Sequence, residues 1–163
     1  MNYSDLYSED LILAINQIPN LNELLGKRVL ITGSTGMVGS GIVDMLLQMN
    51  RTFNAGVVIS VSSRLKKKVE NRFENLIDGK QLKFVSYDSL LDTDVEEQYD
   101  YVIHAAAPAN PKEYGQHPFE TINSIVAGTS SMLNVSKKSG AKRFLYISSS
   151  EVYGKKQTAD PYK

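Results

Sequence analysis

Three glycines spaced three residues apart are the feature of this sequence that most directly suggests chemistry. Gly33, Gly36 and Gly39 follow an apolar run at residues 29–32, and apolar residues at helical spacing come after them. This pattern predicts a strand, a tight turn and a helix. Glycines in such a turn permit a sharp bend, a close approach of the backbone to a ligand, and close packing of the helix on the strand.

The start of the predicted helix suits a phosphate group, because unpaired N–H groups and the positive end of the helix dipole meet there. We therefore expect a nucleotide cofactor whose pyrophosphate lies on this turn. The predicted contacts are Gly33, Thr35, Gly36, Met37, Val38 and Gly39. The spacing is G-x-x-G-x-x-G rather than the widely quoted G-x-G-x-x-G, and the alternative is a glycine-rich turn without a ligand.

The elements that must position this turn alternate along the chain. Apolar runs predict strands, and helical periodicity predicts helices between them. The predicted strands are 28–32, 57–61, 82–87, 101–105 and 144–148, and the predicted helices are 36–50, 65–77 and 118–139. This alternation indicates an α/β fold with a doubly wound parallel sheet. Together with the glycine turn, it leads us to expect the NAD(P)-binding Rossmann fold. Strands one, four and five are continuous apolar runs, so we expect both of their faces to be covered.

A further amphipathic helix is predicted ahead of the first strand, at residues 4–17. We expect residues 1–24 to form a helical extension that packs on the domain or on a partner. Residues 25–163 are then the dinucleotide-binding domain, and we find no linker that divides it.

The composition excludes several classes of function. The 163 residues are 42% hydrophobic and 22% charged, and their net charge is zero, which gives no electrostatic reason for a nucleic-acid or membrane partner. Without cysteine there are no disulfides or thiolate metal sites, and His104 and His117 are not spaced like metal ligands. No apolar stretch reaches about 18 residues, and no signal peptide is evident. We expect a cytoplasmic protein that holds no metal.

Small and polar residues follow the predicted strands. Ligands of doubly wound sheets bind at the carboxyl ends of the strands, where the strand order reverses. The residues at these ends, besides the glycine turn, are Ser62, Ser63, Arg64, Asp88, Ala105, Ala106, Ala107, Pro108, Ser148, Ser149 and Ser150. We expect them to surround the ligand.

The residues after the second strand bear on which dinucleotide is bound. A carboxylate there accepts hydrogen bonds from the ribose of NAD, whereas an Arg with small polar neighbours accommodates the 2′-phosphate of NADP. Ser62, Ser63 and Arg64 include no carboxylate, which favours NADP over NAD; alternatively, Arg64 only begins the next helix. Asp88 can accept a hydrogen bond from adenine or can cap the following turn. The alanines after strand four leave room for a flat ring, and close packing would require small residues equally.

Four segments together resemble the extended short-chain dehydrogenase/reductase family, the NAD(P)-dependent nucleotide-sugar epimerases and dehydratases. They are residues 32–39, 104–108, 123–129 and 148–154, so the likeness runs from about residue 27 to 155. Within the family, Ala107-Pro108-Ala109-Asn110-Pro111 and Ser149-Ser150-Glu151-Val152-Tyr153-Gly154 are most similar to UDP-glucuronate decarboxylases, and sugar-nucleotide 4,6-dehydratases come next.

The resemblance implies an activity and roles for several residues. A bound nicotinamide dinucleotide would oxidise a hydroxyl of a nucleotide sugar, with a UDP-sugar as the expected substrate. Ser149 would hold the sugar oxygen, and Glu151 is a candidate acid or base at the sugar ring. Asn123 and Ser148 would join the cofactor site, and Pro108 and Ser150 the substrate site. Tyr153 is expected to be structural.

Two departures from the family pattern shape the expectation. The acidic residue usual after strand two is replaced by Ser62, and the catalytic Tyr-x-x-x-Lys beyond the serine is absent. We therefore expect an N-terminal piece of a longer enzyme, one that forms homo-oligomers and binds cofactor more readily than it turns over substrate. The alternatives are a non-catalytic NAD(P)-binding module that senses redox state, and a carbonyl reductase of the same fold.

Overall fold

The strands form one parallel sheet whose order reverses near its middle. A computed structural model of the chain describes residues 3–63, 65–86, 97–108 and 111–154. Its five-stranded sheet has the order β3-β2-β1-β4-β5. The strands are β1 (Arg28–Thr32), β2 (Val58–Ser63), β3 (Leu82–Ser86), β4 (Tyr101–His104) and β5 (Arg143–Tyr146). The doubly wound, Rossmann-like arrangement predicted from the sequence is therefore confirmed.

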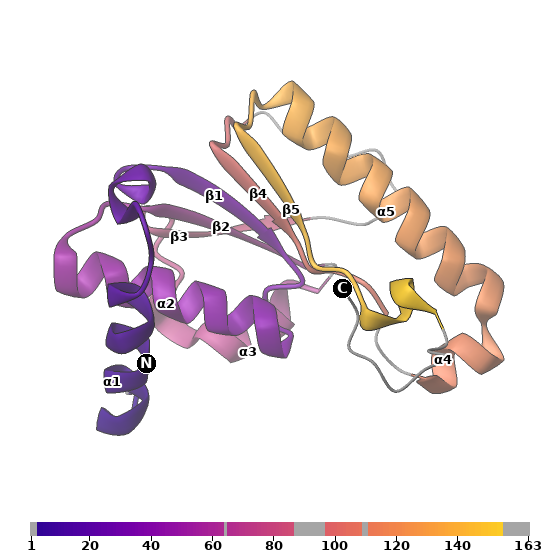
Figure 1. Cartoon of the computed structure of the whole chain (residues 1–163), viewed down its shortest axis with the longest axis horizontal. Helices are drawn as coiled ribbons and strands as arrows, with labels where there is room; N and C mark the ends of the chain where they lie inside the picture. Colours follow the sequence, from indigo (N-terminus) through magenta and orange to yellow (C-terminus); the bar gives the residue numbers. More distant parts are fainter. Residues whose placement is uncertain (1–2, 64, 87–96, 109–110, 155–163) are drawn as a thin grey trace.

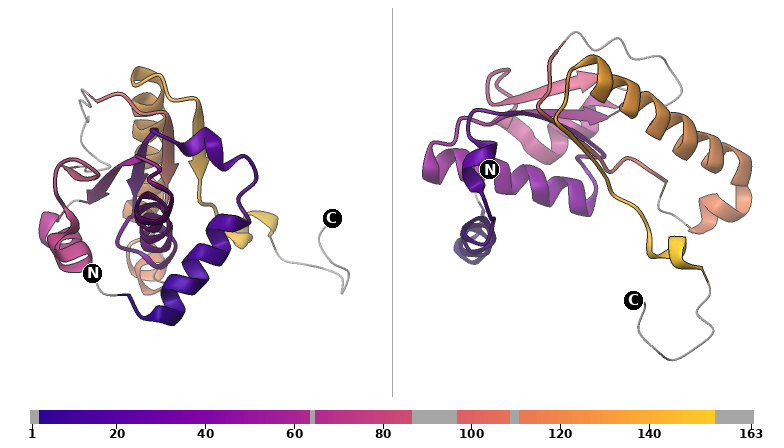
Figure 2. Two further views of the ribbon diagram at one scale, coloured as in Figure 1. Left: turned by 90° about the vertical axis from the view of Figure 1, so that its left-hand side faces the viewer. Right: turned by 45° about the horizontal axis from the view of Figure 1, so that its top comes forward.

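Helices lie on both faces of this sheet (Figure 1). The α-helices are α1 (Asp5–Asn16), α2 (Met37–Phe53), α3 (Lys66–Phe73), α4 (Pro111–Gln116) and α5 (Pro118–Lys138), and the 3-10 helices are η1 (Leu21–Leu24), η2 (Glu74–Leu76) and η3 (Ser150–Tyr153). Helices α2 and α3 cover one face, and α5 covers β4 and β5 on the other. Helix α1 packs on α2, on the side away from the sheet (Figures 1 and 2).

The alternation of side chains along β1 divides the core in two. Val29 and Ile31 belong to the larger cluster, under α2 and α3, where Phe73 is fully buried. Leu30 points to the opposite face and joins Val102 and Met132 under α5. Because both faces of β1 are buried, this strand has one well-defined register.

Most of the predicted elements occur close to their predicted positions. Strand β1 has the predicted bounds, and α2 continues three residues past the predicted end at Asn50. The helix predicted at 65–77 is broken at Glu74, which has a φ of +42°, so that a 3-10 turn follows α3. The predicted N-terminal helix is α1, capped by the Ser4 hydroxyl, which accepts a hydrogen bond from the Tyr7 N–H. Among the described residues no helix is long and apolar enough to cross a membrane.

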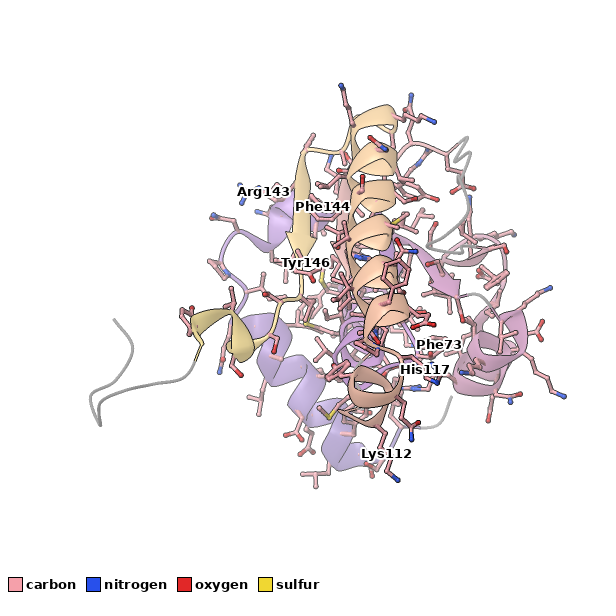
Figure 3. The ribbon with its side chains drawn as sticks, turned by 90° about the vertical axis from the view of Figure 1, so that its right-hand side faces the viewer. Phe73, Lys112, His117, Arg143, Phe144 and Tyr146 are labelled. Atoms are coloured by element: carbon pink, nitrogen blue, oxygen red, sulfur yellow. The ribbon has the colours of Figure 1, made fainter. Side chains whose placement is uncertain are left out.

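The expectation that strand five is covered on both faces is wrong for the described part of the chain. Among the described residues, strand β5 pairs only with β4 and forms the edge of the sheet, and Leu145 is 51% exposed. Figure 3 shows Arg143, Phe144 and Tyr146 along this strand, beside α5. In the described part of the chain, α5 covers one face of β5, which leaves the other face open. The apolar run was read correctly as a strand, but it does not reveal the strand's position in the sheet.

Candidate dinucleotide-binding site

The glycines between β1 and α2 serve different purposes. Gly33 has a φ of +67°, and a Cβ there would lie 2.3 Å from the Ala105 carbonyl oxygen. At Gly39, a Cβ would lie 2.3 Å from the Gly33 carbonyl oxygen. Gly33 therefore permits the bend and the approach to β4, and Gly39 lets α2 rest on the turn.

Gly36 lies on the exposed surface of the turn. Its φ of −77° and ψ of 168° suit any residue, so the backbone conformation does not demand glycine. The nearest non-neighbouring atom to a Cβ there would be the Gly33 carbonyl oxygen, at 3.3 Å. Because Gly36 is exposed and has no side chain, a ligand can approach the backbone of the turn closely there. This is the role expected of one glycine in a phosphate-binding turn.

The first turn of α2 is open to an anion. Gly36 is the N-cap and has no side chain with which to cap the following N–H groups. Its own N–H donates to the Gly33 carbonyl at 3.0 Å, which closes the turn. The side chain of Met37 is 91% exposed, and that of Val38 is also exposed. The N-terminus of a 17-residue helix thus faces solvent beside the glycine turn, with its dipole and free N–H groups favouring a phosphate.

The ends of β1 and β4 are tied together at the point where the strand order reverses. Thr32 and His104 are paired in register, and the Thr32 Oγ1 lies 2.6 Å from the His104 Nδ1. The Ala105 N–H donates to the Thr32 carbonyl at 3.2 Å. Gly33 and Ala105, which follow these residues, are consequently held side by side. The structure therefore brings the glycine turn and the predicted alanines Ala105 and Ala106 together.

His104 is a buried residue that supports the site, and this role was not predicted from the sequence. It is 1% exposed, and its ring stacks on that of Tyr146 with the centroids 5.8 Å apart. Burial lowers the pKa of His104, so the ring is neutral at pH 7 and one of its nitrogens is an acceptor. The available sequence signal was a single polar residue closing an apolar strand. The sequence placed His104 in the predicted strand 101–105 and in the segment 104–108, and its spacing did not suit a metal ligand.

The end of β2 presents a buried hydroxyl that has no partner among the described residues. Ser62 is 2% exposed, and its Oγ has no hydrogen-bond partner within the described residues. Its carbonyl accepts a hydrogen bond from the Ser34 hydroxyl at 3.5 Å, so β2 is tied to the turn after β1. The Ser63 hydroxyl accepts from the Leu65 N–H. Because buried hydroxyls are nearly always satisfied, the orphaned Ser62 Oγ fits a polar group supplied by a ligand at this edge.

The remaining predicted residues differ in their surroundings. Arg64 and Asp88 lie outside the described residues. Thr35 is half-buried in the turn, Ala107 is exposed, and the half-buried Pro108 accepts a hydrogen bond from the Tyr114 hydroxyl through its carbonyl. Asn123 has an exposed side chain on α5.

The serines after β5 leave the sheet at the same end as the glycine turn. The Ile147 N–H donates to the His104 carbonyl at 2.9 Å, which extends the ladder beyond β5. Ser148, Ser149 and Ser150 follow as exposed residues, and the 3-10 helix η3, which includes Glu151, begins at Ser150. The glycine turn after β1 and the serines after β5 therefore both continue from the carboxyl edge of the sheet, where ligands of this fold bind.

Comparisons with known proteins agree with this geometry. The sequence model of the NAD-dependent epimerase/dehydratase family matches residues 29–163. UDP-glucuronic acid decarboxylase 4 of Arabidopsis thaliana is 39% identical over 127 residues, which are 78% of this chain and 27% of that protein. UDP-glucuronic acid decarboxylase 1 of Danio rerio is 33% identical over 134 residues, 82% of this chain and 30% of that protein. The chain therefore spans about 30% of the length of these relatives.

Solved structures share the fold over a similar extent. A UDP-N-acetylglucosamine 4-epimerase from Methanobrevibacter ruminantium M1 superposes with a TM-score of 0.68 and 26% identity, covering 84% of this chain and 42% of that one. A UDP-glucose-4-epimerase from Stenotrophomonas maltophila, solved with bound NAD, has a TM-score of 0.60 and 25% identity, covering 82% and 40%.

The resemblance stated from four segments is thus confirmed, including the similarity to UDP-glucuronate decarboxylases. The family's description names NAD, and the preference for NADP remains a prediction. From the match over residues 29–163 and the shared fold, the chain belongs to the NAD-dependent epimerase/dehydratase family.

Proposed function

We propose that this chain is the dinucleotide-binding part of an NAD(P)-dependent nucleotide-sugar epimerase, dehydratase or decarboxylase. The observation that carries the proposal is the turn between β1 and α2. Gly33 and Gly39 are required for packing there, whereas Gly36 leaves space on the exposed surface of the turn, where a Cβ would approach the Gly33 carbonyl oxygen to 3.3 Å. The pyrophosphate of NAD or NADP fits this space, because it would meet the N–H groups of the first turn of α2.

The orphaned Ser62 hydroxyl supports an adenosine ribose at the end of β2. A hydroxyl is both donor and acceptor, so it can bond a ribose oxygen or a 2′-phosphate oxygen. A carboxylate would repel the phosphate, and Ser62 does not. We therefore propose that NADP binds at least as well as NAD, with Ser63 and Arg64 as the adjoining residues and Asp88 near the adenine.

We further propose that a UDP-sugar is the substrate and that the residues after β4 and β5 handle it. The bound nicotinamide would supply the hydride acceptor for oxidation of a sugar hydroxyl. Ser149 would hold the oxygen of that hydroxyl, and Glu151 would exchange a proton at the sugar ring. Pro108 and Ser150 would bound the sugar. The names of the relatives support the UDP-sugar, since the decarboxylase and the two epimerases are all named for UDP-linked sugars.

A second copy of the chain is the proposed partner, and the outer face of α5 is the proposed contact. Residues 121–136 of this helix contain no charged side chain. Phe119, Ile122, Val126 and Leu133 form an exposed apolar stripe along it. An uncharged helix with one apolar exposed face suits helix-on-helix packing better than contact with water.

The dinucleotide proposal is tested by calorimetric titration of the chain with NAD, NADP, ADP-ribose and adenosine. NAD, NADP and ADP-ribose should bind, because each carries the pyrophosphate, and adenosine should bind far more weakly. If neither NAD nor NADP binds at millimolar concentration, the proposal is wrong. Incubation of the NAD-loaded chain with UDP-glucuronate then separates a competent enzyme from a binding module, since only the former forms reduced nicotinamide or product.

A further inference from the structure

The segment ahead of the sheet is joined to α2 through one buried carboxylate. The side chain of Asp44, in the middle of α2, is fully buried. It accepts hydrogen bonds from the Tyr3 hydroxyl at 2.8 Å and from the Tyr7 hydroxyl at 3.0 Å. The Arg72 guanidinium of α3 pairs with the same carboxylate at 2.5 Å. Three parts of the chain that are far apart in sequence therefore meet at Asp44.

The two tyrosines are arranged to act as permanent donors. Their rings pack edge to face with the centroids 5.3 Å apart, and the Arg51 guanidinium lies over the Tyr3 ring. Burial and the hydrogen bond to Asp44 raise the pKa of both Tyr3 and Tyr7, so both hydroxyls keep their protons at neutral pH. Leu11 and Ile15 continue the same contact as buried residues on α1.

The first turn of α2 needs such external support. Gly36, Gly39 and Gly41 lie in or beside this turn, and glycine is among the poorest helix formers. The side chain of Met37 is 91% exposed, so its packing contributes little to holding the turn. The turn is held from below by the contact of Gly39 with Gly33. Asp44 lies eight residues beyond Gly36, which is about 12 Å along the helix axis.

We propose that Asp44 is a positioning residue for the dinucleotide: through Tyr3, Tyr7 and Arg72 it fixes α2 against α1 and α3, and so holds the first turn of α2 in place over the pyrophosphate. This inference rests on the proposed function. The family model begins at residue 29, so Tyr3 and Tyr7 lie outside the matched region. The N-terminal segment is thereby assigned a part in cofactor binding, although it does not reach the cofactor.

The test compares two ways of weakening the cluster with a matched control. Asp44→Asn removes the charge that pairs with Arg72, and the double variant Tyr3→Phe, Tyr7→Phe removes only the two hydroxyl donors. Asp100→Asn is the control, because Asp100 also loses a charge that pairs with cations, at the other end of the sheet from the glycine turn. The affinity for NAD is measured by calorimetry at a temperature at which each variant is fully folded.

Both cluster variants should bind NAD about tenfold more weakly than the wild-type chain, within the usual range for coupling between separate sites. Hydrogen exchange of the amides of residues 37–40 should be faster in these variants. The Asp100→Asn chain should melt at a lower temperature with an unchanged affinity and unchanged exchange at these amides. If Asp44→Asn does not fold, the tyrosine variant decides the question.

The outcomes distinguish this inference from the function on which it rests. Wild-type affinity in a folded tyrosine variant, with unchanged exchange at residues 37–40, would overturn the role of Asp44. Equal weakening by Asp100→Asn would also overturn it, because the effect would then follow stability alone. Failure of the wild-type chain to bind either dinucleotide would instead overturn the proposed function.

Discussion

Substitution of single glycines in the turn should separate folding from cofactor binding. Gly33→Ala places a methyl group 2.3 Å from the Ala105 carbonyl oxygen and forces a left-handed φ on a residue with a side chain. Gly36→Val places its Cβ 3.3 Å from the Gly33 carbonyl oxygen at an ordinary φ. Gly41→Ala is the matched control within α2, because a Cβ there would meet nothing within 4 Å.

The expected magnitudes follow from these contacts. A left-handed alanine costs about 1–2 kcal/mol, and forcing the turn away from β4 costs about 1–3 kcal/mol. Gly33→Ala should therefore lower the free energy of unfolding by about 2–5 kcal/mol, a large part of the stability of a typical domain. Gly36→Val should lower it by about 1 kcal/mol, because valine is a poor N-cap. Gly41→Ala should raise it by up to about 1 kcal/mol.

The affinities should follow a different order. In the Gly36→Val chain, the new isopropyl group would exclude the pyrophosphate from the N–H groups of α2 and remove charge-assisted hydrogen bonds worth about 1.5–3 kcal/mol. The affinity of Gly36→Val for NAD should fall by roughly ten- to a hundredfold or more. Gly41→Ala should bind like the wild-type chain. Urea unfolding gives the stabilities, calorimetry gives the affinities, and far-ultraviolet circular dichroism verifies the fold of each variant.

Two results would refute this reasoning. Unchanged NAD binding by a folded Gly36→Val chain would mean that the pyrophosphate does not lie on the turn. Wild-type stability of Gly33→Ala would mean that the turn does not press against β4 as the contact at Ala105 indicates.

Three further predictions concern other parts of the chain. Ser62→Asp should shift the ratio of affinities toward NAD and away from NADP, as measured by parallel titrations; an unchanged ratio would exclude Ser62 from the ribose site. The Arg28 N–H, and after it the nearby lysines, hold the pKa of Asp100 below its ordinary value of 3.8. The stability that Asp100 contributes should therefore be complete above about pH 4 and be lost as the pH falls further, so thermal melts of Asp100→Asn should lack this part of the acid transition. Val126→Glu should convert a dimer into a monomer by light scattering, and a dimer that survives this charge would exclude the α5 face as the contact.

Much of the fold could be predicted from the sequence because it depends on local patterns. The bounds of β1 follow from an apolar run that ends in glycine, and the parallel sheet follows from the alternation of strands and helices. The place of a strand in the sheet is not a local property. The apolar residues of β5 resemble those of β1, yet Leu145 is exposed at the edge while Ile31 is buried at the centre.

In the candidate site too, local features could be predicted from the sequence, whereas contacts between distant residues could not. The glycines were identifiable by their spacing, but only the structure shows that a side chain at Gly33 would collide with Ala105, whereas one at Gly36 would approach the Gly33 carbonyl oxygen to 3.3 Å. The bond between Thr32 and His104 joins residues 72 positions apart, and the cluster at Asp44 draws on Tyr7 of α1 as well as on α2 and α3. No periodicity connects such residues, so these features could not have been predicted.

The contact between β1 and β4 also bears on the order in which the chain acquires its structure. Strand β1 can pair with β2 soon after both are synthesised, whereas its other neighbour, β4, begins only at Tyr101. Until then, the edge of β1 is unpaired and Gly33 has no contact with Ala105, so the turn cannot take its final shape. Pairings this distant in sequence make folding slow. A dinucleotide that binds only after β4 has joined would favour the completed sheet over the partly formed one, and would thus act late in folding as a stabilising ligand.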